Sequence, residues 1–470
     1  MNRPVMLVNA NVVEPPVSPV GLEYVGEALS AEGIPVRPVD LALEPDWRKA
    51  LGRELENSQP LAVGVTVRNT DDSSLATKHS FLPWIRDVVN EIKAIGGPYV
   101  ILGGGGFSIM PESVLRFTGA DIGVAGDGEH TMPMIAKQLD NGDDIADLPN
   151  VVHRKKKKVV CNRRVDVDPQ HLPLPRRRIF DNPRYEQLGA MVGIETKRGC
   201  SEACIFCADP VAKGHNIRLR PPSTVAREFH DLVAQGVTWF HLCDSEFNLP
   251  ISHAKEVCHA LIEAGLGERI HWYCYCAPVP FDRELVTLMR KSGCNGIGFG
   301  VDSLHDEQLA RLGRTHRIAN VQRLVATLKD EGMNFMIDLL AGGPGETEET
   351  LRYSIDKVRE LDVPLAGIAL GLRVYAGTPL AKALSKGSIK EGLHPGSEDT
   401  PELSYYLSPN LGDDAFSLLG QLVGGDSRFL SLSLPSEEGS YNYAGDEMLS
   451  TLIKKGARGA YWDILSRQGE

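Results

Sequence analysis

Short apolar runs alternate with helical patterns through the first third of the chain. Runs that predict strands lie at residues 5–9, 36–40, 61–67 and 99–102, and helical spacing of apolar residues lies at 20–31 and 81–95. Most of these strands are apolar throughout, which is typical of a parallel sheet covered by helices on both faces. The pattern predicts an α/β fold, a doubly wound Rossmann-like domain over residues 1–150. Ligands of such sheets sit at the carboxyl ends of the strands.

A second series of strand–helix units predicts a barrel over residues 185–390. Its six apolar runs lie at 191–194, 237–242, 270–276, 296–301, 335–340 and 366–372, with helical patterns between them. Six units suit a partial (β/α)₆ barrel, a shortened relative of the eight-unit barrel. Chemistry in parallel barrels collects at the carboxyl ends of the strands.

The remaining segments predict a connector and a C-terminal region. Residues 151–160 place a basic run between two apolar ends, which is typical of a hairpin with a solvated turn, and residues 168–175 are rich in proline. We expect residues 151–184 to join the two domains. Residues 391–470 begin with a polar linker and carry helical patterns at 416–423 and 448–465, so we expect a small, mainly helical region on the substrate side of the barrel.

Three cysteines carry the strongest chemical signal. Cys200, Cys204 and Cys207 form a C-x₃-C-x₂-C pattern directly after the first barrel strand. Three thiolates can hold three irons of a [4Fe–4S] cubane, whose fourth iron stays open to a small molecule. Zinc would require a fourth Cys or His at metal-ligand spacing, and the next cysteine is Cys243. The pattern favours an open-site cluster, with zinc or unligated thiols as the alternative.

This motif, with Phe206 before its last cysteine, resembles the signature of the radical S-adenosylmethionine (SAM) enzymes. The resemblance implies that SAM chelates the open iron and is cleaved to a 5′-deoxyadenosyl radical. Later segments match the SAM contacts of that family. They are Asp244-Ser245, Asp302-Ser303, the loop Gly342-Gly343-Pro344, and Arg373. Relatives carry Glu-Ser where this chain has Asp302-Ser303, and acidic residues after strands also cap helices.

Two glycine-rich segments follow strands of the first domain. They are Gly103-Gly104-Gly105-Gly106 and Gly126-Asp-Gly128-Glu129. Glycine lets a bulky ligand approach the backbone closely, although a tight turn explains either segment as well. A dinucleotide is disfavoured, because the G-x-G-x-x-G fingerprint with a downstream acidic residue is missing.

Together with the cysteine motif, these loops resemble the cobalamin-binding domain of cobalamin-dependent radical SAM enzymes. The axial-ligand motif Asp-x-His-x-x-Gly is absent from the sequence, as in many members of this subfamily. The resemblance implies cobalamin contacts from Thr66, Arg68 and Asn69 at a strand end, and it places Arg68 near cobalt as a catalytic residue. A helix cap or a surface charge is the alternative for Arg68.

Composition limits the partners and the compartment. The net charge of −12 argues against wrapping a nucleic-acid backbone, and no apolar run is long enough to span a bilayer. Nine cysteines and no secretory leader indicate a reducing cytoplasm. A small-molecule substrate and a low-potential electron donor such as flavodoxin or ferredoxin are the expected partners.

The resemblance implies a C-methyltransferase, similar to the tryptophan-methylase-like members. Such enzymes move a methyl group from SAM through methylcobalamin to an unactivated or weakly activated carbon, here of a small molecule such as a natural product. The alternatives are oxidation or cyclisation without net methyl transfer, and methyl transfer without a productive radical. A methylthiotransferase should carry further cysteines in residues 1–160, which contain none. A cobalamin-sensing binding protein would leave the cysteine loop without a role.

The cysteine motif generates the first testable prediction. Changing Cys200, Cys204 and Cys207 to Ala should abolish iron incorporation and SAM cleavage, because each thiolate holds one iron. Iron content and the visible absorbance of the reconstituted protein measure this. Retention of about four irons per chain, the full cubane complement, would refute the assignment.

Overall fold

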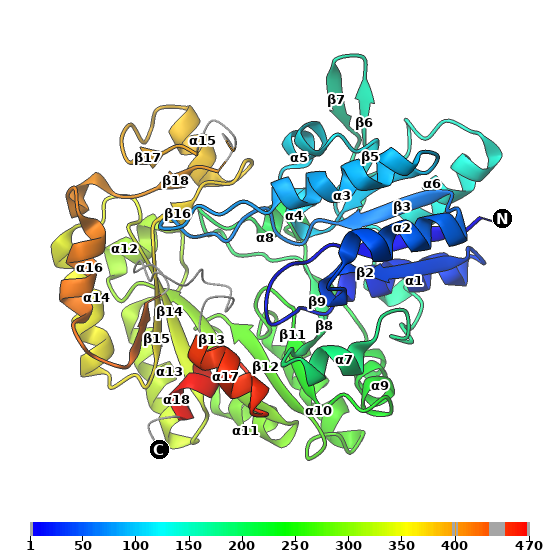
Figure 1. Ribbon diagram of the computed structural model, residues 1–470. Helices are drawn as coiled ribbons and strands as arrows, with labels where there is room; N and C mark the ends of the chain where they lie inside the picture. Colours follow the sequence, from blue (N-terminus) through cyan, green and yellow to red (C-terminus); the bar gives the residue numbers. More distant parts are fainter. Residues whose placement is uncertain (1–2, 397–399, 401–402, 432–446, 468–470) are drawn as a thin grey trace.

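The computed structural model describes residues 3–396, 400, 403–431 and 447–467. Two seven-stranded sheets dominate the architecture. The N-terminal sheet (blue to cyan) and the barrel sheet (green to yellow) lie side by side, and the chain between them crosses from one to the other (Figure 1). None of the described helices combines the length and apolar character needed to cross a membrane.

The N-terminal sheet has the strand order β2-β1-β3-β4-β5-β6-β7. Its first five members are parallel, and β6 and β7 add an antiparallel hairpin at one edge. The strands are β1 (Val5–Asn9), β2 (Val36–Asp40), β3 (Ala62–Thr66), β4 (Tyr99–Gly103), β5 (Ile122–Val124), β6 (Val151–Lys155) and β7 (Lys158–Cys161). The predicted parallel α/β domain is therefore present. The basic hairpin, which we expected in the connector, extends the sheet of this domain.

Helices cover both faces of this sheet, as the apolar strands require. The helices are α1 (Val20–Ala31), α2 (Trp47–Ser58), α3 (Leu82–Ile95), α4 (Gly105–Ile109), α5 (Pro111–Thr118) and α6 (Thr131–Asn141). Helices α1 and α6 bury one face around Leu7 and Ile135, whereas α2, α3 and α5 bury the other around Val63 and Val88. Helix α2 was not predicted, because only Ala50, Leu51 and Leu55 of its residues are buried among charged neighbours.

The barrel sheet has the order β19-β15-β14-β13-β12-β11-β8, with every pair parallel. Its members are β8 (Val192–Ile194), β11 (Trp239–Leu242), β12 (His271–Cys276), β13 (Cys294–Asp302), β14 (Phe335–Ala341), β15 (Ala366–Leu370) and β19 (Phe429–Ser431). The six predicted strands are present. The prediction missed β19, a short strand from the C-terminal region that extends the open edge beyond β15.

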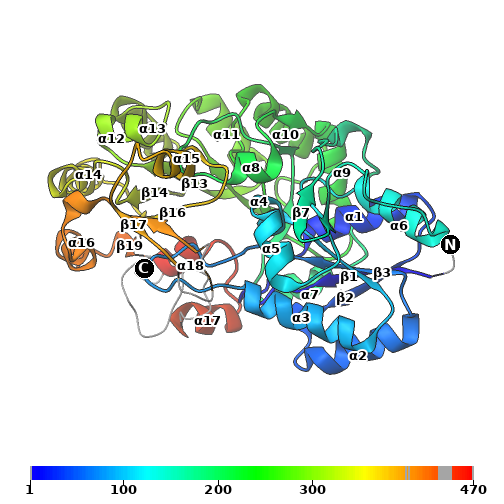
Figure 2. The ribbon, with the colours of Figure 1, turned by 90° about the horizontal axis from the view of Figure 1, so that it is seen from above.

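Helices cover the outer face of the barrel sheet (Figures 1 and 2). They are α9 (Pro222–Val233), α10 (Ile251–Glu263), α11 (Arg283–Lys291), α12 (Asp306–Arg311), α13 (Ile318–Asp330) and α14 (Glu348–Glu360). Two short strands, β9 (Lys197–Arg198) and β10 (Arg218–Leu219), pair antiparallel around the cysteine segment and α8 (Asp209–Lys213). Helix α7 (Asn182–Gln187) ends the connector.

The C-terminal region is mainly helical. Its helices are α16 (Ala415–Val423), α17 (Glu447–Lys454) and α18 (Tyr461–Ser466). Its strands β17 (Leu393–His394) and β18 (Tyr405–Tyr406) form a small sheet with β16 (Leu372–Arg373) from the end of the barrel segment, which also carries α15 (Pro379–Ser385). The single helix predicted over 448–465 is wrong. It divides into α17 and α18, because Gly456 and Gly459 adopt φ angles of 103° and 123° that end one helix and redirect the chain before the next.

A buried ion pair joins the two domains through the connector. Arg177 is fully buried and donates to Glu228 of α9 at 2.7 Å and to the carbonyl of Gly193 at 2.9 Å. The Tyr24 hydroxyl of α1 donates to the same Glu228 carboxylate at 3.0 Å. Glu23, also from α1, lies 3.9 Å from Arg177 Nε. Charges removed from water in this way need complete pairing.

This pairing generates a prediction on stability. Arg177→Met keeps the side-chain volume but removes the buried cation beside Glu23 and leaves Glu228 with Arg220 alone, so unfolding should cost about 3 kcal/mol less. Urea denaturation followed by circular dichroism measures the change. Arg178→Met is the matched control, because Arg178 is exposed and its loss should stay within about 0.5 kcal/mol. Equal midpoints for the two variants would contradict the role of the pair.

Candidate functional site

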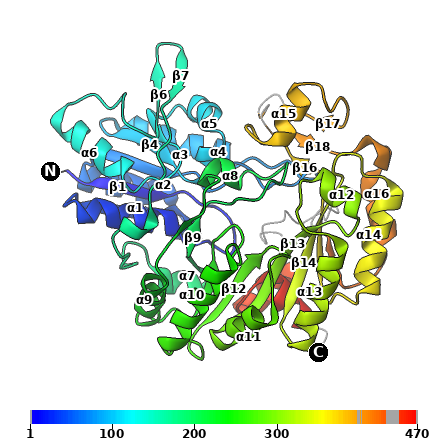
Figure 3. The same cartoon turned by 180° about the vertical axis from the view of Figure 1, so that it is seen from behind.

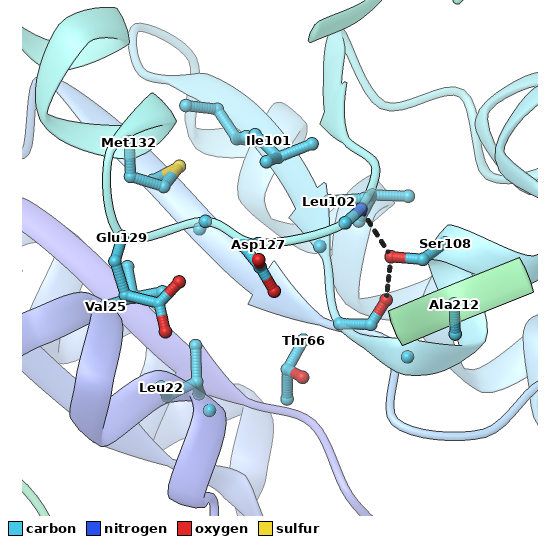
Figure 4. A pocket seen from close by; sticks show the side chains of 18 of the residues that line it. Leu22, Val25, Thr66, Ile101, Leu102, Ser108, Asp127, Glu129, Met132 and Ala212 are labelled. Atoms are coloured by element: carbon cyan, nitrogen blue, oxygen red, sulfur yellow. Dashed lines mark hydrogen bonds between the residues drawn. The ribbon is translucent and has the colours of Figure 1, made fainter. Parts of the chain in front are cut away.

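A cavity of about 180 Å³ lies at the carboxyl ends of the N-terminal strands, between α1 and α6. Leu22, Val25 and Ile101 give it apolar walls, and Asp127 and Glu129 lie at its polar side (Figure 4). The structure brings seven predicted contact residues to this lining. They are Thr66, Gly103, Gly104, Gly105, Gly126, Gly128 and Glu129. These residues are spread over more than sixty positions of the sequence, and the fold brings them to one cavity. That they contact cobalamin stays a prediction.

Two glycine loops shape the rim of this cavity. Gly104 adopts φ 101°, and a Cβ atom there would lie 2.7 Å from the carbonyl oxygen of Val67. Ser108 ties the loops together, since its hydroxyl donates to Gly104 O at 2.8 Å and accepts from Gly126 N at 2.9 Å (Figure 4). The loops can pack this closely because glycine has no side chain.

The three motif cysteines lie in the segment between β9 and α8. Cys200 and Cys204 are buried and Cys207 is half-buried. Burial raises the pKa of all three thiols, that of Cys204 to about 11. Among the described residues, no three Cys, His, Asp or Glu side chains converge on one point that could hold a single metal ion. A cubane distributes its thiolates over separate irons, and binding would displace the thiol protons.

Charged side chains surround the cysteine segment. Arg314 Nη1 donates to Cys204 Sγ at 2.9 Å, and Arg314 Nε lies 2.8 Å from Asp302 Oδ2. Glu246, which the sequence analysis did not single out, is also beside this arginine. Burial raises the pKa of Glu246 to about 8, although Arg314 opposes the shift, and its Oε2 atom has no hydrogen-bond partner in the described structure.

Several predicted SAM contacts are engaged within the fold. Asp244 is buried, accepts from Thr196 N at 2.8 Å and pairs with Lys197 at 3.0 Å. Arg373 pairs with Asp71 of the N-terminal domain at 3.1 Å. These two side chains therefore connect segments of the chain, and their roles toward SAM stay predictions.

The other predicted SAM contacts show the same tendency. Ser245 Oγ lies 2.5 Å from Asp209 Oδ2, and Ser303 Oγ lies 3.1 Å from Ser354 Oγ. Glu346 accepts hydrogen bonds from the backbone amides of Gly342 and Gly343. Phe206 packs in a small apolar cluster with Leu312 and Leu372, and Pro344 belongs to the Gly342 loop.

A second cavity, of about 310 Å³, lies inside the barrel. Its walls include the rings of Tyr273, Tyr275, Trp462 and His241. The N-terminal domain also contributes, through Arg68, Asn69 and the segment 15–17. Residues of helices α17 and α18 provide the remaining side. That the C-terminal region faces the substrate stays a prediction.

The middle of one face of β13 carries no side chains. Gly296, Gly298 and Gly300 alternate along the strand, so they share a face. A Cβ atom at these positions would lie 2.6 Å from the Trp462 ring, 2.7 Å from the Tyr275 ring and 2.9 Å from Arg314 Nη2, in that order. Because the three glycines have no side chains, the two rings and the Arg314 guanidinium can pack directly against the strand.

Sequence and structure comparisons agree on the family. A sequence model described as the radical SAM superfamily matches residues 194–358, and one described as a B12 binding domain matches residues 6–136. The tryptophan 2-C-methyltransferase of Streptomyces laurentii is 28% identical over 97% of this chain and 95% of its own.

Two structures of the radical SAM methyltransferase TsrM from Kitasatospora setae are similar along the whole chain. The structure with cobalamin and a [4Fe–4S] cluster bound has a TM-score of 0.91 and 29% identity, covering 100% of this chain and 98% of that one. The structure with tryptophan substrate and a SAM analogue bound has a TM-score of 0.90 and 30% identity, covering 99% of each chain. The chain belongs to the cobalamin-dependent radical SAM methyltransferases. The predicted fold class and methyltransferase class are thereby confirmed.

In this methyltransferase, Asp338 of β14 generates a prediction on pH. Burial, and then the charge of Asp302, raise its pKa from 3.8 to about 7. The folded protein therefore binds one more proton than the unfolded chain between these values. Stability should fall as the pH rises through this window, with the penalty complete above it.

Asp338→Asn removes this penalty, so it should stabilise the protein at pH 8 by roughly 4 kcal/mol and have little effect at pH 4. Urea midpoints at the two pH values measure the difference. Asp140→Asn, at an exposed position of α6, is the control and should show no such contrast. An equal effect of Asp338→Asn at both pH values would contradict the raised pKa.

Proposed function

We propose that this methyltransferase transfers a methyl group from SAM, by way of cobalamin, to a ring carbon of a planar aromatic amino acid such as tryptophan. One observation carries the proposal. The end of β3 and the residues directly after it border both cavities, with Thr66 in the lining of the N-terminal cavity and Arg68 and Asn69 in that of the barrel cavity. A cofactor held by the first cavity is therefore adjacent to a substrate in the second.

The N-terminal cavity suits cobalamin. Its glycine rim admits a bulky group, and its apolar walls suit a flat aromatic tail. No histidine belongs to the lining formed by the described residues, and we propose that cobalamin binds without a protein imidazole on cobalt. The chemistry supplied by cobalamin is carriage of a methyl group. Arg68 brings a positive charge to the boundary between the cavities, and we place it next to cobalt.

The barrel cavity suits an aromatic substrate. Tyr273, Tyr275 and Trp462 offer ring faces that orient a flat molecule and exclude water. The volume is in the usual range for small-molecule sites. Tryptophan is bound as substrate in the similar TsrM structure from Kitasatospora setae, which supports the same substrate class here.

The cysteine segment suits a [4Fe–4S] cluster held by Cys200, Cys204 and Cys207, with SAM nearby. The chemistry supplied by the cluster is electron transfer. Arg314 would stabilise the negative charge of the thiolates, since it already donates to Cys204. We propose that flavodoxin or ferredoxin provides the electrons in a reducing cytoplasm, and that no nucleic acid takes part.

The test uses the full-length protein loaded with iron, sulfide and cobalamin. With L-tryptophan and methyl-labelled SAM under reducing, anaerobic conditions, mass spectrometry should find the label on a ring carbon. If the protein retains cobalamin but tryptophan carries no label, the assignment of tryptophan as the substrate is refuted.

Gly103→Leu tests the cofactor cavity. Gly103 lines it, and a Cβ atom there would meet only one backbone oxygen, at 3.9 Å. A leucine should fill the cavity and reduce cobalamin retention at least tenfold, about 1.4 kcal/mol, as measured by visible absorbance after gel filtration. Gly52→Leu, on α2 with open space around it, is the control and should retain cobalamin. Equal retention of cobalamin by both variants would show that cobalamin does not bind in this cavity.

A further inference from the structure

A buried carboxylate behind the wall of the barrel cavity anchors two of the rings that line it. Asp463 of α18 is 2% exposed and does not belong to the lining itself. Its Oδ2 atom accepts a hydrogen bond from the Tyr273 hydroxyl at 2.5 Å, and its Oδ1 atom accepts one from Asn334 Nδ2 at 2.6 Å. Arg467, one helical turn later, donates to the same carboxylate. Asp463 therefore joins the C-terminal segment to β12 and to the residue before β14.

Each hydrogen bond in this cluster has a defined donor and acceptor. Burial, and then the hydrogen bond to Asp463, raise the pKa of the Tyr273 hydroxyl, so the phenol keeps its proton and donates it. A carboxylate only accepts hydrogen bonds, whereas the Asn334 amide N–H and the Arg467 guanidinium donate them. The bond from Tyr273 ends on a charged acceptor, and such bonds are stronger than those between neutral groups.

The rings of Tyr273 and Trp462 form a corner of the cavity. Both rings line it, their planes are 87° apart, and their centroids are 6.0 Å from each other. Trp462 directly precedes Asp463 in the chain. Gly459 passes close to the Tyr273 hydroxyl, because a Cβ atom at Gly459 would lie 2.5 Å from it. Asp463 thus holds one wall of the corner through a hydroxyl and the other through the backbone of α18.

A flat ligand binds best to walls that are already in place. Helix α18 has six residues, too few for a helix to be stable alone in water, so its contacts with the barrel keep it in position. Without Asp463, the Tyr273 ring and α18 lose their common anchor. Binding then has to order both walls, which lowers the affinity.

We propose that Asp463 is a positioning residue that sets the affinity for the aromatic substrate by fixing the corner of Tyr273 and Trp462. The inference rests on the proposed function, because it concerns the cavity proposed there for the substrate. It assigns recognition of the flat ring to two walls from distant parts of the chain. The substrate meets the ring of Tyr273, while the hydroxyl of Tyr273 stays engaged with Asp463.

The test measures the Kd of L-tryptophan for the full-length, cofactor-loaded protein by isothermal titration calorimetry. Asp463→Ala should raise this Kd about tenfold, as expected for the loss of one hydrogen bond to a charged group. Asp463→Asn should recover part of the affinity, because its amide oxygen can still accept from Tyr273. Tyr273→Phe keeps the ring but removes the hydroxyl, and it should weaken binding as much as Asp463→Ala. Asp356→Ala, at an exposed position of α14, is the control and should bind as the wild type.

The double variant Asp463→Ala/Tyr273→Phe separates positioning from general destabilisation. If Asp463 acts through Tyr273, the double variant should bind tryptophan no more weakly than either single variant. It should also retain cobalamin, as measured by visible absorbance after gel filtration. An additive loss of about a hundredfold would show that the two residues act independently and would overturn the proposed role.

The remaining outcomes are distinguishable. An unchanged Kd for tryptophan in Asp463→Ala or in Tyr273→Phe would overturn the role of Asp463 and leave the proposed function intact. If Asp463→Ala does not fold, Tyr273→Phe decides alone, since it removes a single oxygen atom. A wild-type protein that retains cobalamin but does not bind tryptophan would overturn the proposed substrate class and this inference with it.

Discussion

The arrangement of the two domains depends on the buried pair of Arg177 and Glu228. The arginine comes from the connector and the carboxylate from the barrel helix α9, while Glu23 and Tyr24 reach the same place from the N-terminal helix α1. Each charge would be costly without the others, so the connector, α1 and α9 have one favourable arrangement. That arrangement fixes the distance between the cofactor cavity and the barrel.

Further contacts tie the functional loops to one another. Arg198 lies two positions before Cys200 and pairs with Glu129 at 2.5 Å, so the second glycine loop is joined to the cysteine segment. Helix α8, directly after that segment, packs beside α4 of the first glycine loop (Figures 1 and 3). Arg373 pairs with Asp71, a few residues from Arg68. The segments that would hold the cluster, cobalamin and the substrate are thus in direct contact. A displacement of one segment would therefore displace the others.

The sequence predicted those features that depend on local pattern. Apolar runs located the strands of both sheets, and the cysteine and glycine motifs located loops that the structure gathers around the sites. Features that depend on distant partners were not predictable. Strand β19 is too short to be recognised before β15 is in place, and Glu246 becomes notable only when folding sets it beside Arg314. Arg373 and Asp244 appeared to be free for a ligand because their partners, Asp71 and Lys197, are visible only in three dimensions.

The glycine row of β13 has a consequence for how such an enzyme can change. Its three members leave room that rings and a guanidinium from other elements occupy, so any larger residue there would collide with them. Larger residues are therefore excluded from these three positions, whereas the Tyr275 and Trp462 side chains themselves line the cavity and determine its shape. Evolution, or a designer, could reshape the cavity through single substitutions at these ring positions. New substrates would thus be accommodated by changes to the rings that pack on β13 and not by changes to β13 itself.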